Sequence, residues 1–85
     1  MRADRDIACA VGATLRGLRR KRGLTQPMLA DLVGISRGGL ATYEAGQHIP
    51  HLVILMRLLV ALGCSWESFG RSLKHSSSPL EGVRR

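Results

Sequence analysis

The stretch from residue 24 to residue 46 constrains the fold more than any other part of this chain. It holds two short segments with helical apolar spacing, which are separated by Gly34. Thr25 and Ser36 precede these segments and are good N-cap residues, and Pro27 fits the first turn of a helix. Two short helices joined by a short turn that contains a glycine pack at a steep angle. The stretch therefore predicts a helix-turn-helix unit.

Packing of these two helices requires particular side chains. A small residue must lie where the helices cross, and Ala30 meets this need. Ile35 follows the glycine and is expected to point inward. The second helix of the unit should begin at Arg37, with Leu40 and Tyr43 facing the core. The apolar face of the first helix is expected to comprise Met28, Leu29, Leu32 and Val33.

Three further helices are predicted from apolar periodicity and from helix-breaking residues. A proline at position 50 is expected to open a helix that ends at Leu62, before Gly63, and Ser65 is expected to cap a short last helix. The helix that precedes the central unit should end before Gly23, and its apolar face comprises Ile7, Val11, Leu15 and Leu18. Five short helices without a strand predict an all-α fold, a compact bundle with the helix-turn-helix unit at its centre.

A chain of 85 residues has room for one domain. Residues 11–73 should form the helix-turn-helix domain, and residues 1–10 should extend its first helix toward the N-terminus. Residues 74–85 are polar and basic, so we expect a flexible tail there.

The charge balance indicates the class of partner. Lys and Arg number 13 against 6 Asp and Glu, which gives a formal net charge of +7. Such an excess is typical of a surface that binds a polyanion, with solubility alone as the alternative interpretation.

The cysteines and the apolar runs of the chain indicate its cellular location. Cys9 and Cys64 fit no CxxC spacing and lie among apolar residues, which predicts buried, reduced thiols. The charged N-terminus does not look like a signal peptide, and the most apolar run, residues 52–62, contains Arg57 and is too short to cross a bilayer. We expect a cytoplasmic protein without a membrane partner.

In order and spacing, these motifs resemble the lambda-repressor and Cro-like (xenobiotic-response-element type) helix-turn-helix transcriptional regulators of bacteria and phages. The resemblance runs from about Val11 to Phe69. It rests on Leu18-Arg19, Gly23-Leu24-Thr25-Gln26, Leu29-Ala30, Val33-Gly34-Ile35-Ser36, Tyr43-Glu44-Ala45-Gly46, Pro50 and Ala61-Leu62-Gly63. It implies a nucleoid-associated regulator that binds double-stranded DNA, and it favours a phage-repressor-like homodimer on a palindromic operator, with the third helix in the major groove.

The resemblance assigns base reading to the start of that helix. Arg37 is suited to a bidentate hydrogen bond with guanine, with a phosphate contact as the alternative. Thr42 could touch a thymine methyl group or a phosphate. Gly38 and Gly39 depart from the family pattern, because a polar reader is more usual there. We therefore expect a sparse direct readout that rests on Arg37, a close backbone approach at Gly38, and a contribution from DNA shape.

Contacts to the DNA backbone are expected on both sides of that helix. Gln26, at a helix N-terminus, corresponds to the glutamine with which the family holds a phosphate. His48 should donate to a phosphate, with some dependence on pH. The remaining backbone candidates are Thr25, Ser36, Gly39 and Gln47, with looser electrostatic contacts from Arg16, Arg20, Lys21 and Arg22.

Two charged residues are expected to be structural. Arg19 and Glu44 correspond to a pair that forms a buried salt bridge between the first and third helices in this family, and two solvated charges are the alternative.

The fourth helix predicts a dimer. Its inward stripe is expected to comprise Leu52, Leu55, Leu59 and Leu62. A second apolar stripe on another side of this helix comprises Val53, Met56 and Val60. Together with Trp66 and Phe69 of the last helix, it should form a homodimer interface. The alternative is that residues 1–10, or the region of Leu73 and Leu80, cover it.

Other functions are less well supported. His48, His51 and His75 have no carboxylate or serine partner at a suggestive spacing, so we expect no enzyme. Combining histidines 48 and 51 with the two cysteines matches no zinc spacing, and neither a metal nor a cofactor is expected. The open alternatives are an antitoxin that binds a partner toxin and autoregulates its operon, and a restriction–modification controller. A small-molecule sensor is disfavoured, because no residues remain for a ligand domain.

Overall fold

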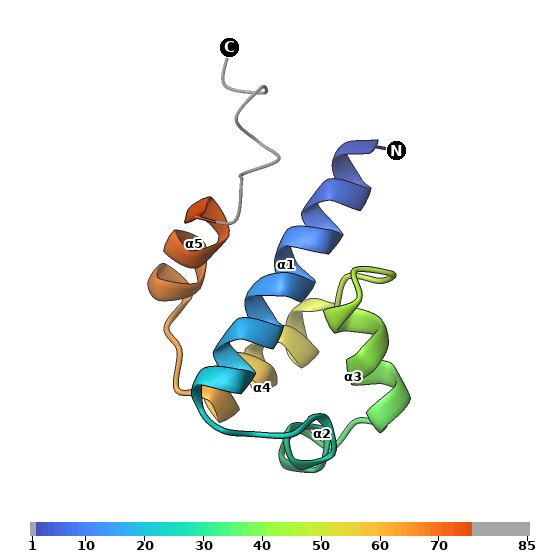
Figure 1. Ribbon diagram of the computed structural model, residues 1–85, viewed down its shortest axis with the longest axis vertical. Coiled ribbons are helices and arrows are strands. Elements are labelled where there is room, and N and C mark those ends of the chain that lie inside the picture. The colour runs from blue at the N-terminus through green and yellow to red at the C-terminus, as the bar shows by residue number, and fades with distance from the viewer. Residues whose placement is uncertain (1, 76–85) are drawn as a thin grey trace.

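Helix α1 (Arg2–Lys21) is the longest element and runs through the middle of the molecule (Figure 1). This computed structural model describes residues 2–75, with side chains for residues 4–73. Four shorter helices follow, α2 (Gln26–Val33), α3 (Arg37–Glu44), α4 (Leu52–Leu62) and α5 (Trp66–His75). The described residues contain no strand, so the predicted all-α architecture is confirmed.

The helix boundaries of the central unit follow from local chemistry. The Thr25 side chain accepts a hydrogen bond from the Met28 N–H at 3.2 Å, and the Ser36 side chain accepts one from the Gly39 N–H at 2.9 Å. Each bond satisfies an amide that the helix itself leaves without a partner. Gly34 ends α2 at a φ of 79°, a left-handed conformation that glycine adopts without strain.

Two predicted boundaries differ from the structure. α4 begins at Leu52 with His51 as its N-cap, so Pro50 precedes the helix and does not open it. The expected extension of the first helix over residues 1–10 is helical from Arg2 onward, so it is not one of these differences. α5 continues to His75, so the first two residues of the predicted tail are helical. The rest of that tail lies outside the described residues.

Four leucines form the centre of the core. Leu15, Leu29, Leu40 and Leu58 are fully buried, and each comes from a different helix. Val11, Val33, Leu59, Leu62 and Phe69 surround them. A second tier of half-buried side chains, including Ile7, Leu18, Ile35 and Leu55, packs against this centre.

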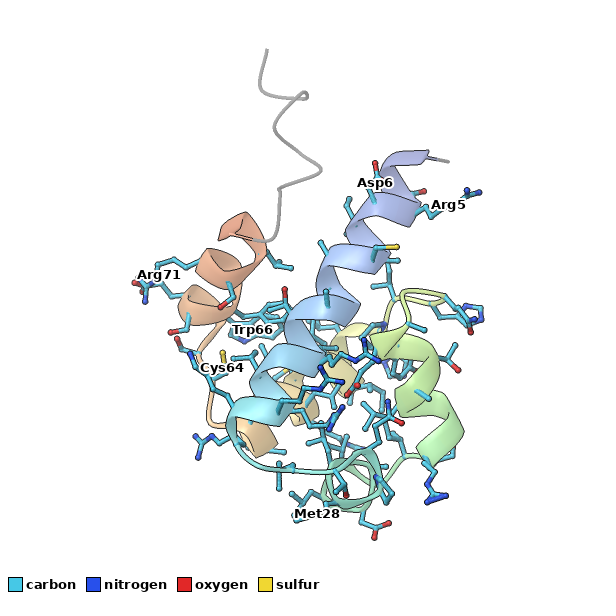
Figure 2. The ribbon with its side chains drawn as sticks, viewed as in Figure 1. Arg5, Asp6, Met28, Cys64, Trp66 and Arg71 are labelled. Atoms are coloured by element: carbon cyan, nitrogen blue, oxygen red, sulfur yellow. The ribbon has the colours of Figure 1, made fainter. Side chains whose placement is uncertain are left out.

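Several predicted inward residues point outward instead. Met28 and Leu32 of α2 are exposed, since Leu29, Ala30 and Val33 already cover the buried side of this short helix. Figure 2 shows Met28 at the outer edge of the bundle. In α4, Leu52 is 65% exposed and Leu58 takes the core position. A helix that is apolar on all sides offers no pattern from which its buried side could be identified.

Gly12 permits a close approach between α1 and α3. A Cβ atom at this position would lie 2.7 Å from the carbonyl oxygen of Glu44 and closer still to that of Tyr43. These are backbone atoms of α3, which cannot move aside as a flexible side chain would. The glycine therefore sets how closely α1 lies against the end of α3.

Both cysteines are free, and the prediction that their side chains are buried is wrong. Cys9 is exposed on α1 and Cys64 is half-buried between α4 and α5. Within residues 2–75 no single helix is long and apolar enough to cross a membrane. Only α4 and α5 taken together reach that length and composition, and they form a pair bent by 98°.

Candidate nucleic-acid interface

The leading end of α3 is held at the surface. Arg37 and Gly38 are exposed, whereas Leu40 and Glu44, farther along the helix, are buried. α3 thus has one side fixed in the core and an N-terminal end that faces solvent. A short helix presented in this way can enter a groove of a double helix.

Few side chains at this end of α3 could form hydrogen bonds with DNA bases. Arg37 is the only charged side chain in the first two turns of α3. The Thr42 hydroxyl donates to the Gly38 carbonyl oxygen at 2.7 Å, so its hydrogen is engaged within the helix. The methyl group and the oxygen lone pairs of Thr42 remain as its possible contacts with a ligand.

The two glycines of α3 have different surroundings. A Cβ atom at Gly38 would meet nothing within 4 Å, so the fold leaves open space there. At Gly39 a Cβ atom would lie 3.0 Å from Ser36 Oγ, the atom that caps the helix. A side chain at position 39 would therefore crowd the cap, whereas one at position 38 would project freely.

A buried ion pair fixes α3 to α1. Arg19 Nε donates to Glu44 Oε2 at 2.7 Å and its Nη2 donates to Glu44 Oε1 at 3.1 Å. Arg19 Nη1 also donates to the Leu24 carbonyl oxygen at 2.7 Å, in the connection between α1 and α2. Bidentate geometry of this kind holds both partners in one orientation. The pair that the resemblance implies is thus present, and it connects α1, α3 and the start of the helix-turn-helix unit.

Gln26 belongs to the same network. Its side-chain Nε2 donates to Glu44 Oε1 at 3.0 Å, and Arg16 Nε lies 4.0 Å from that oxygen. The bond to Glu44 was not predicted, since the resemblance indicates Gln26 as a phosphate contact. No sequence signal indicates this bond, because it depends on how α2 is seated against the end of α3.

The loop between α3 and α4 adds polar groups beside α1. Gln47 and His48 are exposed, and both line a shallow pocket together with Asp4 and Arg5 of α1. Arg5 is a further candidate that the sequence does not indicate, because the predicted contacts from the first helix all lie near its other end, from Arg16 onward. Figure 2 shows Arg5 projecting outward near the start of α1.

The second apolar stripe of α4 is exposed, as predicted. Val53, Met56 and Val60 line a groove together with Leu32 of α2, a residue predicted to lie on the inward apolar face of that helix. The assignment of Phe69 to a dimer interface is wrong, because this side chain is 4% exposed and belongs to the core. Trp66 is 49% exposed.

The described residues show no group of three or more His, Cys, Asp or Glu side chains that could hold a metal ion. The carboxylate of Glu44 is paired with Arg19 and accepts a further hydrogen bond from Gln26.

Comparison with known proteins agrees with this geometry. Residues 10–67 match the model of a helix-turn-helix domain. The restriction–modification controller protein C.AhdI from Aeromonas hydrophila has a similar structure, with a TM-score of 0.68 and 35% sequence identity over 78% of this chain and 94% of that one.

Sequence relatives carry similar names. The SPbeta prophage-derived HTH-type transcriptional regulator YonR of Bacillus subtilis (strain 168) is 39% identical over 64% of this chain. The HTH-type transcriptional regulator y4dJ of Sinorhizobium fredii (strain NBRC 101917 / NGR234) is 37% identical over 71% of it. The matched segment spans 50% of the Bacillus protein and 78% of the Sinorhizobium protein.

Proposed function

Because this chain belongs to the helix-turn-helix family of DNA-binding transcriptional regulators, we propose that it is a cytoplasmic repressor. It binds a palindromic operator as a homodimer, with α3 in the major groove. The observation that carries this proposal is the exposed leading end of α3, where Arg37 projects from a helix whose other side is fixed by Leu40 and Glu44.

In this proposal the site residues divide into three groups. Arg37 reads bases, with Thr42 and the close backbone approach at Gly38. The DNA backbone is held from both sides of α3 by Thr25, Gln26, Ser36, Gly39, Gln47 and His48. The net charge of +7 attracts the phosphates and makes the affinity strongly dependent on salt.

The homodimer would form through the exposed apolar residues of α4. Val53, Met56 and Val60 form a continuous groove with Leu32, and an exposed patch of this kind usually marks an interface. Trp66 is exposed at the start of α5 and could extend the contact. Binding of a palindrome requires the two copies of α3 in this dimer to lie about 34–36 Å apart, one turn of DNA, or a multiple of that distance.

The decisive experiment selects bound sequences from a random DNA pool, first with the natural chain and then with Arg37→Ala. The natural chain should enrich a palindrome, and Arg37→Ala should lose the preference while it keeps its helical content and weak general affinity. Loss of a bidentate contact removes about 1–3 kcal/mol of discrimination. An unchanged preference in the variant would refute the reading role of Arg37.

A second candidate is a restriction–modification controller, favoured by the structural similarity to C.AhdI over nearly the whole of that chain. Such a controller would also bind DNA through α3, so the two candidates differ in the genes they regulate. Mapping the bound sites in the genome of the source organism distinguishes them: a site upstream of adjacent restriction and modification genes would select the controller.

A further inference from the structure

A polar pocket lies where the end of α1 meets α5, and neither the helix-turn-helix unit nor the apolar groove uses it. It has a volume of about 550 Å³ and is open to solvent. In Figure 1, α5 and α3 lie on opposite sides of α1, so the α5 wall of this pocket is turned away from the proposed DNA-reading helix.

Three cationic side chains line this pocket, Lys21 at the end of α1, Arg22 in the turn that follows it, and Arg71 from α5. The one acidic group beside them in the described residues is Glu67, which pairs with Arg71 at 3.0 Å on the solvent side. The cluster therefore carries a net charge of about +2, which matches a phosphate group, whose charge at pH 7 is about −1.5 to −2.

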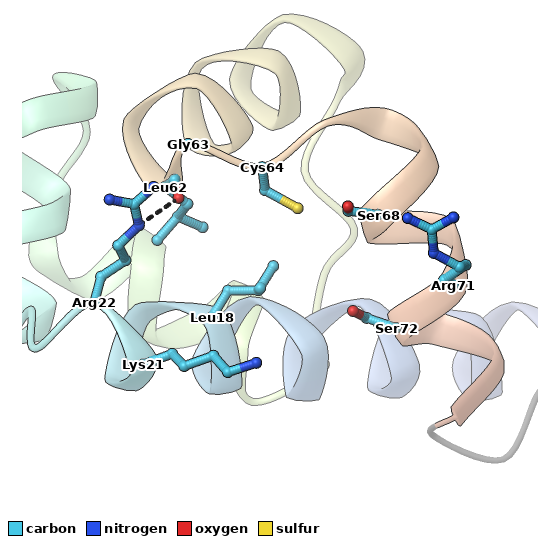
Figure 3. A pocket seen from close by; sticks show the side chains of 9 residues that line it. All are labelled: Leu18, Lys21, Arg22, Leu62, Gly63, Cys64, Ser68, Arg71 and Ser72. Carbon is cyan, nitrogen blue, oxygen red and sulfur yellow. Dashed lines mark hydrogen bonds between the residues drawn. The ribbon is translucent and has the colours of Figure 1, made fainter.

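One of these cations is fixed in place. Arg22 Nε donates to the Leu62 carbonyl oxygen at 2.8 Å, at the end of α4. A Cβ atom on Gly63 would lie 3.0 Å from Arg22 Cζ and would overlap Nη2, so the guanidinium occupies space that only a glycine leaves free. The dashed line in Figure 3 marks this bond. Arg22 is thus preorganised at the wall of the pocket.

The remaining lining suits an organic phosphate. Ser68 projects from α5 into the pocket, where its hydroxyl group can donate to a phosphate oxygen (Figure 3). Leu18 and Leu62 supply an apolar floor. A volume of this size is typical of sites for small molecules and exceeds what an inorganic ion fills.

We propose that this pocket binds a small organic molecule through its phosphate group, with Lys21, Arg22 and Arg71 as the anion-binding residues. The site needs no separate ligand domain, because it is formed within the five-helix bundle. It does not depend on the operator proposal, and each can fail without the other.

Thermal unfolding of the full chain in the absence of DNA tests the site, with inorganic phosphate and phenyl phosphate as probes and sodium chloride at matched ionic strength as the reference. Phosphate should raise the Tm, by about 4 °C once its concentration reaches several times its Kd. Phenyl phosphate should reach the same shift at a lower concentration, because its ring covers the apolar floor. Equal potency of the two probes would contradict an organic ligand.

Lys21→Gln/Arg71→Gln should lose the shift, because it removes two of the three cations. Arg20→Gln is the matched control, since Arg20 lies in the same last turn of α1 but does not line the pocket. Arg37→Gln should also keep the shift. Loss of the shift in either control, or its persistence in the double variant, would overturn the proposal.

A titration with duplex DNA in phosphate-free buffer separates a free phosphate ligand from the phosphates of DNA. Arg71→Gln should leave the slope of log affinity against log salt unchanged. A slope that falls by about 0.9 would mean that a DNA phosphate occupies the pocket, and the assignment to a small molecule would fail.

Discussion

The side-chain amide of Gln26 donates to Glu44 Oε1 at 3.0 Å, so the residue proposed to hold a DNA phosphate is anchored to the carboxylate that also binds Arg19. Nε2 of Gln26 carries two hydrogens, and the bond to Glu44 uses one of them. The second hydrogen is available to a phosphate oxygen without loss of the first bond. The ion pair of the folded chain thus orients a group at the proposed interface.

Gln26→Ala should weaken binding to the operator and to unrelated duplex DNA by the same factor. A backbone contact carries no sequence information, so the ratio of the two affinities should not change. Because glutamine is neutral, the slope of log affinity against log salt should also stay the same. Fluorescence anisotropy at several salt concentrations measures both quantities. A change in the ratio would show that Gln26 contributes to base reading.

Glu44→Ala should destabilise the fold by about 3–5 kcal/mol, because it leaves the Arg19 guanidinium buried without its partner. Glu67→Ala is the control, since the pair of Glu67 with Arg71 has side chains 80% and 63% exposed. Its loss should change stability by less than about 1 kcal/mol. Urea unfolding monitored by circular dichroism gives both free energies. Similar values for the two variants would argue against the structural importance of the buried pair.

Two glycines of α1 should respond to alanine with opposite signs. Gly17→Ala should stabilise the protein by about 1 kcal/mol, because a Cβ atom there meets nothing within 4 Å and alanine favours the helix. Gly12→Ala should destabilise it by about 1–3 kcal/mol, because its Cβ would overlap the carbonyl oxygens of Tyr43 and Glu44. Thermal unfolding of the two variants gives the Tm values that test these opposite signs. A rise in both would mean that α1 and α3 can separate without cost.

Val60→Glu should shift the proposed homodimer toward monomer, because Val60 is 79% exposed in the single chain and lies in the apolar groove. At a concentration where the natural chain is also monomeric, the folding stability of the variant should stay within about 0.5 kcal/mol of the natural value, as for other surface substitutions. Ile49→Glu is the control, since Ile49 is also an exposed apolar residue but lies in the loop before α4. Sedimentation equilibrium compares the two. Equal dimerisation of both variants would place the interface elsewhere.

The helix ends of the helix-turn-helix unit could be predicted from neighbouring residues in the sequence. The buried side of a helix could not, where it depends on packing against other helices. The helix ends at Thr25, Ser36 and Gly34 are as expected, because capping and left-handed turns depend on residues that are close in the sequence. The buried side of α4 could not be predicted, because Leu52 and Leu58 have the same chemistry and only the neighbouring helices distinguish them.

At the candidate site, too, some features could be predicted from the sequence and others could not. The ion pair of Arg19 and Glu44 and the exposed position of Arg37 were expected from the family resemblance. The third partner, Gln26, and the nearby Arg5 were not, because each depends on the placement of one helix against another.

Because the space around Gly38 is open, a substitution there could change which DNA sequence is bound without affecting the fold. A side chain added at this position would extend toward solvent from a helix whose cap and buried side remain untouched. Under the proposed mode of binding, copies of this gene could therefore diverge toward new operators by single replacements at residue 38, without compensating changes in the core. Position 38 is likewise a place where protein engineers could introduce a base-contacting side chain while the rest of the bundle stays unchanged.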